Sequence, residues 1–254
     1  MRGGVAMNVD ALDRIEAIKD RLEHDGRVRI RHLAADLGVS DMTIRRDLDL
    51  LAEQGVARRV RGGAVTIGPR RFPDRTRDHP RAKSVIAQKL VDLVPDRGAV
   101  ALDASSTVQR LAARLTHVHD LTVLTNGPET FSALQGQPGV RALLTGGELD
   151  ARTGSLVGPL AARSAGDLLV DRLFVGAAAL DADLGSSEAT LDEAEIKLAL
   201  AAGAAEIVLA VDSSKLGSRG TARAFPIDRV ALLVTELDPQ DQRLDPFRDR
   251  CALR

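Results

Sequence analysis

A run of small polar and basic side chains near the start of the chain could read the edges of DNA bases. The run contains Ser40, Met42, Thr43, Arg45 and Arg46. Arginine can donate two hydrogen bonds to guanine O6 and N7, and threonine and methionine can contact base edges or a thymine methyl group. A pair of arginines alone would be better explained as a solvated helix face, so the interpretation depends on the elements that position the run.

The residues around this run predict a helix-turn-helix. Leu33 and Leu37 mark one apolar helical face, and Gly38 ends that helix in a tight turn. Ser40 can cap a second helix, because its hydroxyl can accept a backbone amide hydrogen bond. Apolar residues recur at helical spacing in this second helix, which we expect to end near Gly55. This is the layout that places a recognition helix in the major groove.

The segment from 56 to 65 predicts a short hairpin, the wing that follows such a motif. Apolar residues alternate with arginines and are interrupted by Gly62 and Gly63, a pattern typical of a turn with positive backbone angles. The arginines that could contact phosphates or the minor groove are Arg58, Arg59 and Arg61. For any one of them, a solvated edge strand is the alternative.

Composition narrows the class of protein. The chain has 254 residues, of which 44% are hydrophobic and 28% charged, so we expect a packed, water-soluble protein. Aromatic residues make up only 2%, which argues against the stacking platforms that bind single-stranded nucleic acids. The net charge of −1 does not itself favour DNA, but a modest basic excess falls between residues 27 and 61, on the proposed recognition helix and wing.

The sequence gives little support for a disulfide, a metal site or a membrane location. The single cysteine, Cys251, has no partner for a disulfide or a metal cluster, and His117 and His119 are better explained as loop residues than as ligands. We therefore expect no metal and no cofactor. No apolar run is long enough to span a bilayer and residues 1–10 lack a signal-peptide core, so we expect a cytoplasmic protein with no membrane partner.

Pattern changes along the chain predict its domain organisation. Residues 1–10 are interpreted as a flexible N-terminus, 11–65 as the winged helix-turn-helix domain, 66–80 as a proline-rich linker and 81–254 as a larger domain. In the larger domain, short apolar runs alternate with helical patterns, which implies an α/β fold with a mainly parallel sheet covered on both faces. The predicted strands are 99–102, 121–124, 140–144, 173–176, 207–211 and 230–234.

Small polar residues follow most of these predicted strands. Ligands bind beyond the carboxyl ends of the strands in open α/β sheets, where hydroxyls, glycine amides and helix N-termini can hold a phosphate. Each loop alone could equally be ordinary turn chemistry, but several in register favour a ligand. The candidates are Asp103, Ser105, Ser106, Thr107, Thr125, Asn126, Gly146, Gly147 and Asp212, with Arg152 and Lys215 as added positive charge.

Both halves of the chain resemble a known family. Residues 33–38, 40–48 and 58–64 resemble the winged helix-turn-helix of the DeoR family of bacterial transcription regulators. The second half resembles the sensor domain of that family. The matching residues are Phe72, Arg77, Lys83, Asp103 to Thr107, Thr125, Asn126, Gly146, Gly147, Gly154, Gly158, Pro159, Val170, Asp171, Phe174 to Ala177, Asp181, Gly185, Glu193 to Lys197 and Asp212 to Lys215.

The resemblance implies a ligand-controlled transcription regulator, most often a repressor of carbohydrate genes. Its sensor domain would share the fold of ribose-phosphate isomerases and CoA-transferase-like proteins, and residues 81–254 would sense an effector and form oligomers. The implied partners are double-stranded DNA, a phosphorylated sugar or related metabolite, and further copies of the chain in a dimer or tetramer. Glu193 and Lys197 join the candidate effector residues through this resemblance.

Two departures from the family pattern keep alternatives open. Ser105-Ser106-Thr107 stands where the family has Gly-Thr-Thr, and Ala178-Ala179 stands where it usually has Asp-Gly. Either the effector differs from common sugar phosphates or its binding is weakened. One alternative is therefore a DNA-binding oligomer with a non-functional pocket. Another is an isomerase-like enzyme that uses Glu193, Glu195, Lys197 and Lys215, although such residues also occur as ion pairs on a solvated helix.

Overall fold

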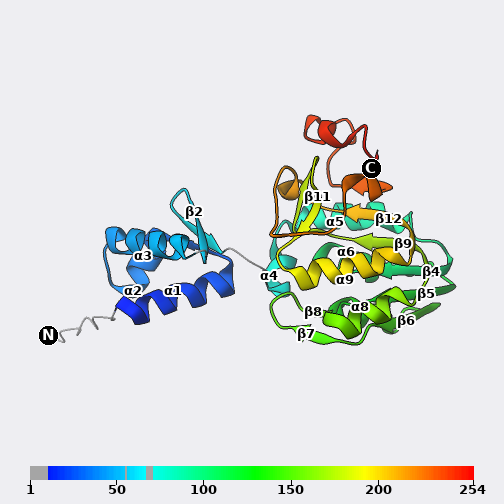
Figure 1. Cartoon of the computed structure of the whole chain (residues 1–254), viewed down its shortest axis with the longest axis horizontal. Coiled ribbons are helices and arrows are strands. Elements are labelled where there is room, and N and C mark those ends of the chain that lie inside the picture. The colour runs from blue at the N-terminus through cyan, green and yellow to red at the C-terminus, as the bar shows by residue number, and fades with distance from the viewer. Residues whose placement is uncertain (1–10, 55, 67–70) are drawn as a thin grey trace. The chain divides into compact units, whose positions relative to one another are not determined.

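The structure, a computed structural model shown in Figure 1, describes residues 11–54, 56–66 and 71–254. The predicted flexible N-terminus, 1–10, and the predicted helix stop at Gly55 lie outside the described residues. The chain divides into two compact units, Met1–Asp74 and Arg75–Arg254, and each is described by itself.

The first unit is a three-helix domain with a small antiparallel sheet in the order β1-β3-β2. Its elements are α1 (Ala11–Asp25), β1 (Arg27–Arg29), α2 (Ile30–Leu37), α3 (Asp41–Glu53), β2 (Ala57–Val60) and β3 (Gly63–Thr66). The core is built from aliphatic side chains at helical spacing on α1, α2 and α3, among them Ile18, Leu33 and Leu48. This is the predicted helix-turn-helix with a β-hairpin wing.

Capping fixes the turn between α2 and α3. Gly38 ends α2 with a φ of 67°, a left-handed angle that favours glycine, and its amide donates to the Ala34 carbonyl. Ser40 Oγ accepts a hydrogen bond from the Thr43 amide at 3.1 Å, as the sequence predicts. A buried ion pair, Arg14 Nε to Asp47 Oδ2 at 2.6 Å, ties α3 to α1.

The second unit is organised around a seven-stranded parallel sheet in the order β15-β14-β12-β9-β4-β5-β6. Its strands are β4 (Arg97–Leu102), β5 (Asp120–Thr125), β6 (Val140–Leu144), β9 (Val170–Val175), β12 (Ala204–Ala210), β14 (Leu232–Val234) and β15 (Ala252–Leu253). The chain builds outward from β4 to β6, returns to β9 beside β4, and then builds toward β15. The strand order therefore reverses between β4 and β9.

Helices cover both faces of this sheet (Figure 1). One core packs under α5 (Pro80–Val91), α6 (Ser106–Ala112) and α7 (Pro128–Leu134), and the other under α8 (Gly158–Gly166) and α9 (Leu191–Ala202). Because its two faces are both buried, the sheet has the continuous apolar strands that the sequence analysis uses to predict it.

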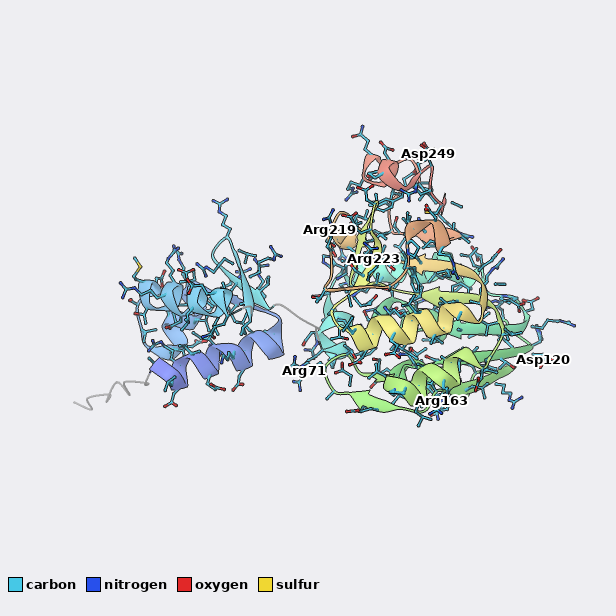
Figure 2. The ribbon with its side chains drawn as sticks, viewed as in Figure 1. Arg71, Asp120, Arg163, Arg219, Arg223 and Asp249 are labelled. Atoms are coloured by element: carbon cyan, nitrogen blue, oxygen red, sulfur yellow. The ribbon has the colours of Figure 1, made fainter. Side chains whose placement is uncertain are left out.

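Short elements that the sequence analysis does not predict complete the second unit. They are the hairpin of β7 (Glu148–Asp150) and β8 (Ser155–Val157), and a small antiparallel sheet of β10 (Ala179–Asp181), β11 (Gly185–Glu188) and β13 (Ala222–Arg223). Figure 2 labels Arg219 and Arg223 near this small sheet. It also labels Asp120, the first residue of β5, at the end of the main sheet where that strand begins. Short 3₁₀ helices lie at Ser213–Lys215, Ile227–Arg229 and Gln242–Phe247.

Within residues 66–80, the predicted linker, the structure contains helix α4 (Phe72–Arg77). The helix is too short for apolar periodicity to reveal it, and Pro73 fits its first turn, where a missing amide costs no hydrogen bond. In the described part of the chain, no helix is both long enough and apolar enough to cross a membrane.

Candidate DNA interface and effector site

Helix α3 presents a polar face to solvent. Ile44, Leu48 and Leu51 are fully buried, which fixes the rotation of the helix about its axis. Met42 is 62% exposed, and Arg45 and Arg46 are also exposed. The structure therefore leaves Met42, Arg45 and Arg46 exposed to solvent, whereas the Ser40 and Thr43 hydroxyls are hydrogen-bonded to each other at the start of the helix.

A basic pocket of about 740 Å³ opens beside this face. It is lined by Arg29, Ile30, Arg31, His32, Asp41, Arg45, Arg59, Val60, Arg61 and Gly62. Five arginines against one aspartate give it a positive potential suited to a phosphate backbone. Arg29, Arg31 and His32 are absent from the residues predicted from sequence. Arg29 ends β1, which pairs with β3 of the wing, and Arg31 and His32 lie in the first turn of α2.

The wing arginines differ in their surroundings. Arg59 Nε forms an ion pair with Asp49 Oδ1 at 2.9 Å, and its Nη1 donates to the Gly63 carbonyl at 3.1 Å. Arg59 thus fastens the wing to the recognition helix. Arg58 and Arg61 are exposed on β2 and in the turn that follows. These two have the greater freedom to contact phosphates.

The two wing glycines are required for different reasons. Gly62 has a φ of 81°, so the predicted positive backbone angle is present there. Gly63 lies in β3 without such an angle, and a Cβ added to it would lie 1.9 Å from the Val28 carbonyl oxygen. Close approach of β1 to β3, rather than an unusual backbone angle, therefore excludes a side chain at Gly63.

In the second unit, Asp103 occupies the point where the strand order reverses. It follows β4, and its Oδ2 accepts a hydrogen bond at 3.0 Å from the Gly176 amide, which follows β9. Its Oδ1 accepts from the Ser105 amide at 3.0 Å. Such switch points at the carboxyl ends of strands are where open α/β sheets bind ligands.

Lys197 lies at the centre of a buried ionic cluster around Asp103. Its Nζ is 2.8 Å from Glu188 Oε1, 3.2 Å from Asp103 Oδ2 and 2.8 Å from the Gly176 carbonyl oxygen. The contacts with Glu188 and Gly176 are hydrogen bonds, and the contact with Asp103 is an ion pair. Glu193 joins the cluster and accepts a hydrogen bond from the Ser155 hydroxyl. Three carboxylates and one ammonium, all 5% exposed or less, leave the cluster with excess negative charge when all four are ionised.

The cluster shifts the pKa values of its members. Burial raises the pKa of Glu188 to about 7, against the opposing effect of Lys197, and Glu193 and Asp103 raise it further. Burial lowers the pKa of Lys197, but Glu188, Asp103 and Glu193 outweigh it, so that this pKa is raised overall. The ammonium therefore stays charged, and Glu188 can hold a proton near neutral pH.

The stability of the second unit should consequently depend on pH through Glu188. The pKa of Glu188 is about 7 in the folded chain, above its ordinary value of 4.5. The stability that protonated Glu188 contributes is therefore complete below pH 4.5 and is lost as the pH rises through 7. Between pH 5 and 8 we expect the free energy of unfolding of the wild type to fall by about 3 kcal/mol relative to that of the Glu188→Gln variant. Urea unfolding at several pH values measures this difference, and a difference that stays constant with pH would contradict the assignment.

The remaining candidate effector residues form local contacts at the strand ends. Thr125 Oγ1 accepts from the Gly127 amide at 3.0 Å, and Asp212 Oδ1 accepts from the Ser214 amide at 3.1 Å. Asn126 donates to the Leu156 carbonyl at 3.3 Å, while its buried Oδ1 has no hydrogen-bond partner among the described residues. That orphaned acceptor is available to a ligand hydroxyl.

Other candidates are placed less centrally. Gly147 has a φ of 123°, and a Cβ there would lie 2.6 Å from the Val157 carbonyl oxygen, so packing alone accounts for this glycine. Gly146 packs against Leu160. Arg152 is exposed in the turn between β7 and β8, and Lys215 is half-buried after β12. Within the described ranges, no group of three or more acidic, histidine or cysteine side chains could hold a metal ion.

The loop in which the sequence departs from the DeoR pattern that it resembles is unstrained. Ser105 has a φ of −76° and a ψ of 146°, which any residue adopts, and its Oγ caps α6 by accepting from the Val108 amide. Serine therefore supplies here a cap that glycine would lack. Ser106 donates its hydroxyl proton to the Arg75 carbonyl, and Thr107 is buried in the first turn of α6.

Glu188 and Ser155 are functional candidates that sequence reasoning misses. Each lies on a strand of three or four residues, β11 and β8, which shows no readable alternation. The only signal is an acidic residue closing the run Gly185-Ser186-Ser187-Glu188, and all four of its residues are buried. A carboxylate in a fully buried strand must have a partner, but sequence alone does not identify it.

The chain combines a winged helix-turn-helix with an α/β unit whose strand ends are polar. This combination is typical of two-domain transcription regulators. A family model described as "DeoR-like helix-turn-helix domain" matches residues 14–70, and one described as "DeoR C terminal sensor domain" matches residues 78–237. The chain belongs to the DeoR family, and the prediction of a DNA-binding transcription regulator is confirmed.

Curated relatives match along most of their length. The chain is 31% identical to the "Putative aga operon transcriptional repressor" of Escherichia coli O157:H7, over 88% of this chain and 86% of that protein. It is 32% identical to the "HTH-type transcriptional regulator GolR" of Listeria innocua, over 85% and 86%. It is 31% identical to a "Lactose phosphotransferase system repressor" of Staphylococcus epidermidis, over 81% and 84%.

Among solved structures, the chain is similar to ribose 5-phosphate isomerase A from Methanocaldococcus jannaschii. The identity is 18%, the match covers 54% of this chain and 55% of that chain, and the TM-score is 0.39.

Proposed function

We propose that the chain is a homo-oligomeric repressor of carbohydrate-related genes whose DNA binding is controlled by a phosphorylated sugar or similar metabolite. The observation that carries the proposal is Asp103 at the switch point between β4 and β9, surrounded by hydroxyls, amides and charged groups. The names of the relatives, a lactose phosphotransferase system repressor among them, support a sugar-related effector.

The DNA-binding surface is proposed to consist of the exposed face of α3 and the wing. Ser40, Met42, Thr43, Arg45 and Arg46 would enter the major groove, and Arg58, Arg61 and the rim of the basic pocket would contact phosphates. In a dimer, two such surfaces would meet half-sites about 10 base pairs apart. Effector binding can shift this arrangement only through a difference in its affinity for the two states of the protein.

We propose no catalytic role and a cytoplasmic place of action. The isomerase alternative needs a free acid, base or electrophile, but Lys197 forms two hydrogen bonds and an ion pair with Asp103, and Glu193 accepts from Ser155. The buried cluster instead resembles a framework that holds the strand-end loops in position. Turnover of a sugar phosphate that is abolished by Glu193→Gln would contradict this assignment.

Arg45→Ala tests base reading by α3. If Arg45 forms two hydrogen bonds with a guanine, the variant should lose about 1–3 kcal/mol of discrimination between operator and random DNA. Lys19→Ala is the matched control, because it removes one positive charge from α1 outside the proposed surface. Fluorescence anisotropy at several salt concentrations measures both. Equal loss on operator and random DNA, with a salt slope reduced by about one, would show a phosphate contact instead.

Thermal unfolding with and without ligand tests the sensor assignment. At about 100 times the dissociation constant, an effector should stabilise the folded chain by roughly 2.7 kcal/mol. The oligomer with a non-functional pocket predicts no shift with any phosphorylated metabolite.

A further inference from the structure

The two helix layers of the second unit differ in the apolar side chains that they expose. Among the residues that the structure describes, Val85 is the one large apolar side chain exposed on α5, α6 or α7. On the other layer, Leu160 of α8 and both Leu191 and Leu198 of α9 are exposed, and Leu169 is exposed just after α8. Single exposed leucines are ordinary on protein surfaces, but four on neighbouring elements indicate a surface with a function.

Helices α8 and α9 lie side by side on one face of the sheet (Figure 1). Their C-terminal ends meet, because a Cβ added to Gly203, the cap of α9, would lie 2.1 Å from the carbonyl oxygen of Leu168, just after α8. The two helices therefore run in the same direction. On α9, Leu191, Glu195 and Leu198 are exposed at steps of four and three residues, which places them on one side of the helix. This side, the exposed side of α8 and Leu169 are called the α8–α9 face.

The α8–α9 face also carries charges of both signs. Arg163 is exposed on α8, where Figure 2 labels it, and Asp192 and Glu195 are exposed in the first half of α9. In the described part of the chain none of these three forms an ion pair, although the two helices are neighbours. Asp167, the cap of α8, lies about 6 Å beyond Arg163 along the helix axis, away from the acidic first turns of α9.

A second copy of the chain can supply a partner for each of these charges. A two-fold axis that runs along the α8–α9 face, between the helices, places α8 of one copy over α9 of the other. Because the helices run in the same direction within a copy, they also run in the same direction across this axis, with N-terminal ends together. Arg163 of each copy then faces the acidic half of α9 in the other copy, and the same contact forms twice. The exposed leucines around these charges would be buried in that contact.

We propose that two copies of the chain associate through the α8–α9 face, with its leucines in the contact and with reciprocal pairs between Arg163 of one copy and Glu195 of the other. The inference rests on the proposed function, because it assigns a surface and a symmetry to the proposed homo-oligomer. A second copy is favoured over a different protein, since a two-fold contact requires one surface to be complementary to itself. A face with both signs of unpaired charge meets that requirement.

Charge reversal in the full chain tests the pairing, with sedimentation velocity over a dilution series as the measurement. Arg163→Glu and Glu195→Arg each place like charges opposite one another across the axis, so each variant alone should associate roughly 100-fold more weakly than the wild type. An equimolar mixture of the two variants should recover association, because every contact in a mixed pair again joins opposite charges. Damage to the fold of either variant could not produce that recovery. Two weakened variants that stay apart when they are mixed would overturn the proposed pairing.

Leu198→Glu tests the apolar part of the face. The substitution brings a carboxylate into the contact from both copies, so association should weaken by roughly 100-fold or more. Val85→Glu is the matched control, because Val85 and Leu198 are both 45% exposed and Val85 lies on α5, in the opposite helix layer. Its association should stay within about twofold of the wild type. Equal weakening by the two variants would contradict a contact through the α8–α9 face.

Failure of the inference and failure of the proposed function give different results. If the wild type assembles, and Leu198→Glu or the charge variants assemble equally well, the copies associate elsewhere. The inference is then wrong and the proposed homo-oligomer stands. If the wild type sediments as a single chain at every concentration, the proposed homo-oligomer is contradicted and the inference fails with it.

Discussion

Replacing Lys197 by methionine should destabilise the second unit by about 3–5 kcal/mol, because removing one partner of a buried ion pair leaves the other charge unpaired. Here three buried carboxylates, Asp103, Glu188 and Glu193, would lose the ammonium that lies among them in the described part of the chain. The loss should be smaller at pH 5 than at pH 8, because Glu188 can take up a proton.

Hydrogen exchange of the β4 and β9 amides measures this loss in the second unit alone, which matters because the chain has no Trp or Tyr to report unfolding by fluorescence. Lys89→Met is the control. Lys89 donates to two backbone carbonyls, of Thr235 and Leu237, and forms no ion pair with a carboxylate of the described residues, so its loss should cost only about 1 kcal/mol. Equal costs for the two lysines would refute a central electrostatic role for Lys197.

Gly63→Ala should disrupt the wing and with it DNA binding. The new Cβ would lie 1.9 Å from the Val28 carbonyl oxygen and 3.2 Å from the Arg29 Cα, so backbone must move. Overpacking of this kind costs about 3 kcal/mol. If DNA binding requires the wing in its original position, binding must supply the energy that restores it. The affinity for operator DNA should then fall by about 100-fold.

Gly62→Ala is a matched control at the adjacent residue, in the turn that precedes β3. Its Cβ would meet no atom within 4 Å, and only the φ of 81° opposes it. That strain costs about 1 kcal/mol, so operator affinity should fall far less than in Gly63→Ala. Anisotropy with operator DNA compares the two variants, and a Gly63→Ala chain that binds like the wild type would show that the wing is not needed.

Much of the fold could be predicted from the sequence, because strong periodicity and capping are local. The predicted bounds of β6 agree with the structure, and the Gly38 turn and Ser40 cap are present. Strand β4 starts two residues earlier than predicted. The apolar pattern used for the prediction does not extend through Gly98, which has a φ of 107°. Helix α3 ends at Glu53, before the expected Gly55, with Gln54 as its cap.

The candidate sites differ in how far sequence could predict them. The exposed face of α3 could be predicted because its residues are contiguous. The ionic cluster could not be, since Asp103, Ser155, Glu188 and Lys197 come from four separate segments, the loop after β4 and the elements β8, β11 and α9. The strand-end pattern found Asp103, but only tertiary packing brings Glu188 to Lys197. Helix α4 shows the same limit, because its contacts with Lys83 and Arg110 join residues of different elements.

Selection of DNA fragments from the genome that encodes the chain tests the central claim, ligand-controlled binding to a specific sequence. The full chain should enrich a small set of fragments that share a two-fold sequence, and one phosphorylated sugar should change that enrichment while its unphosphorylated parent does not. Enrichment of no fragment above random DNA, at any salt concentration and with every probe, would contradict the account.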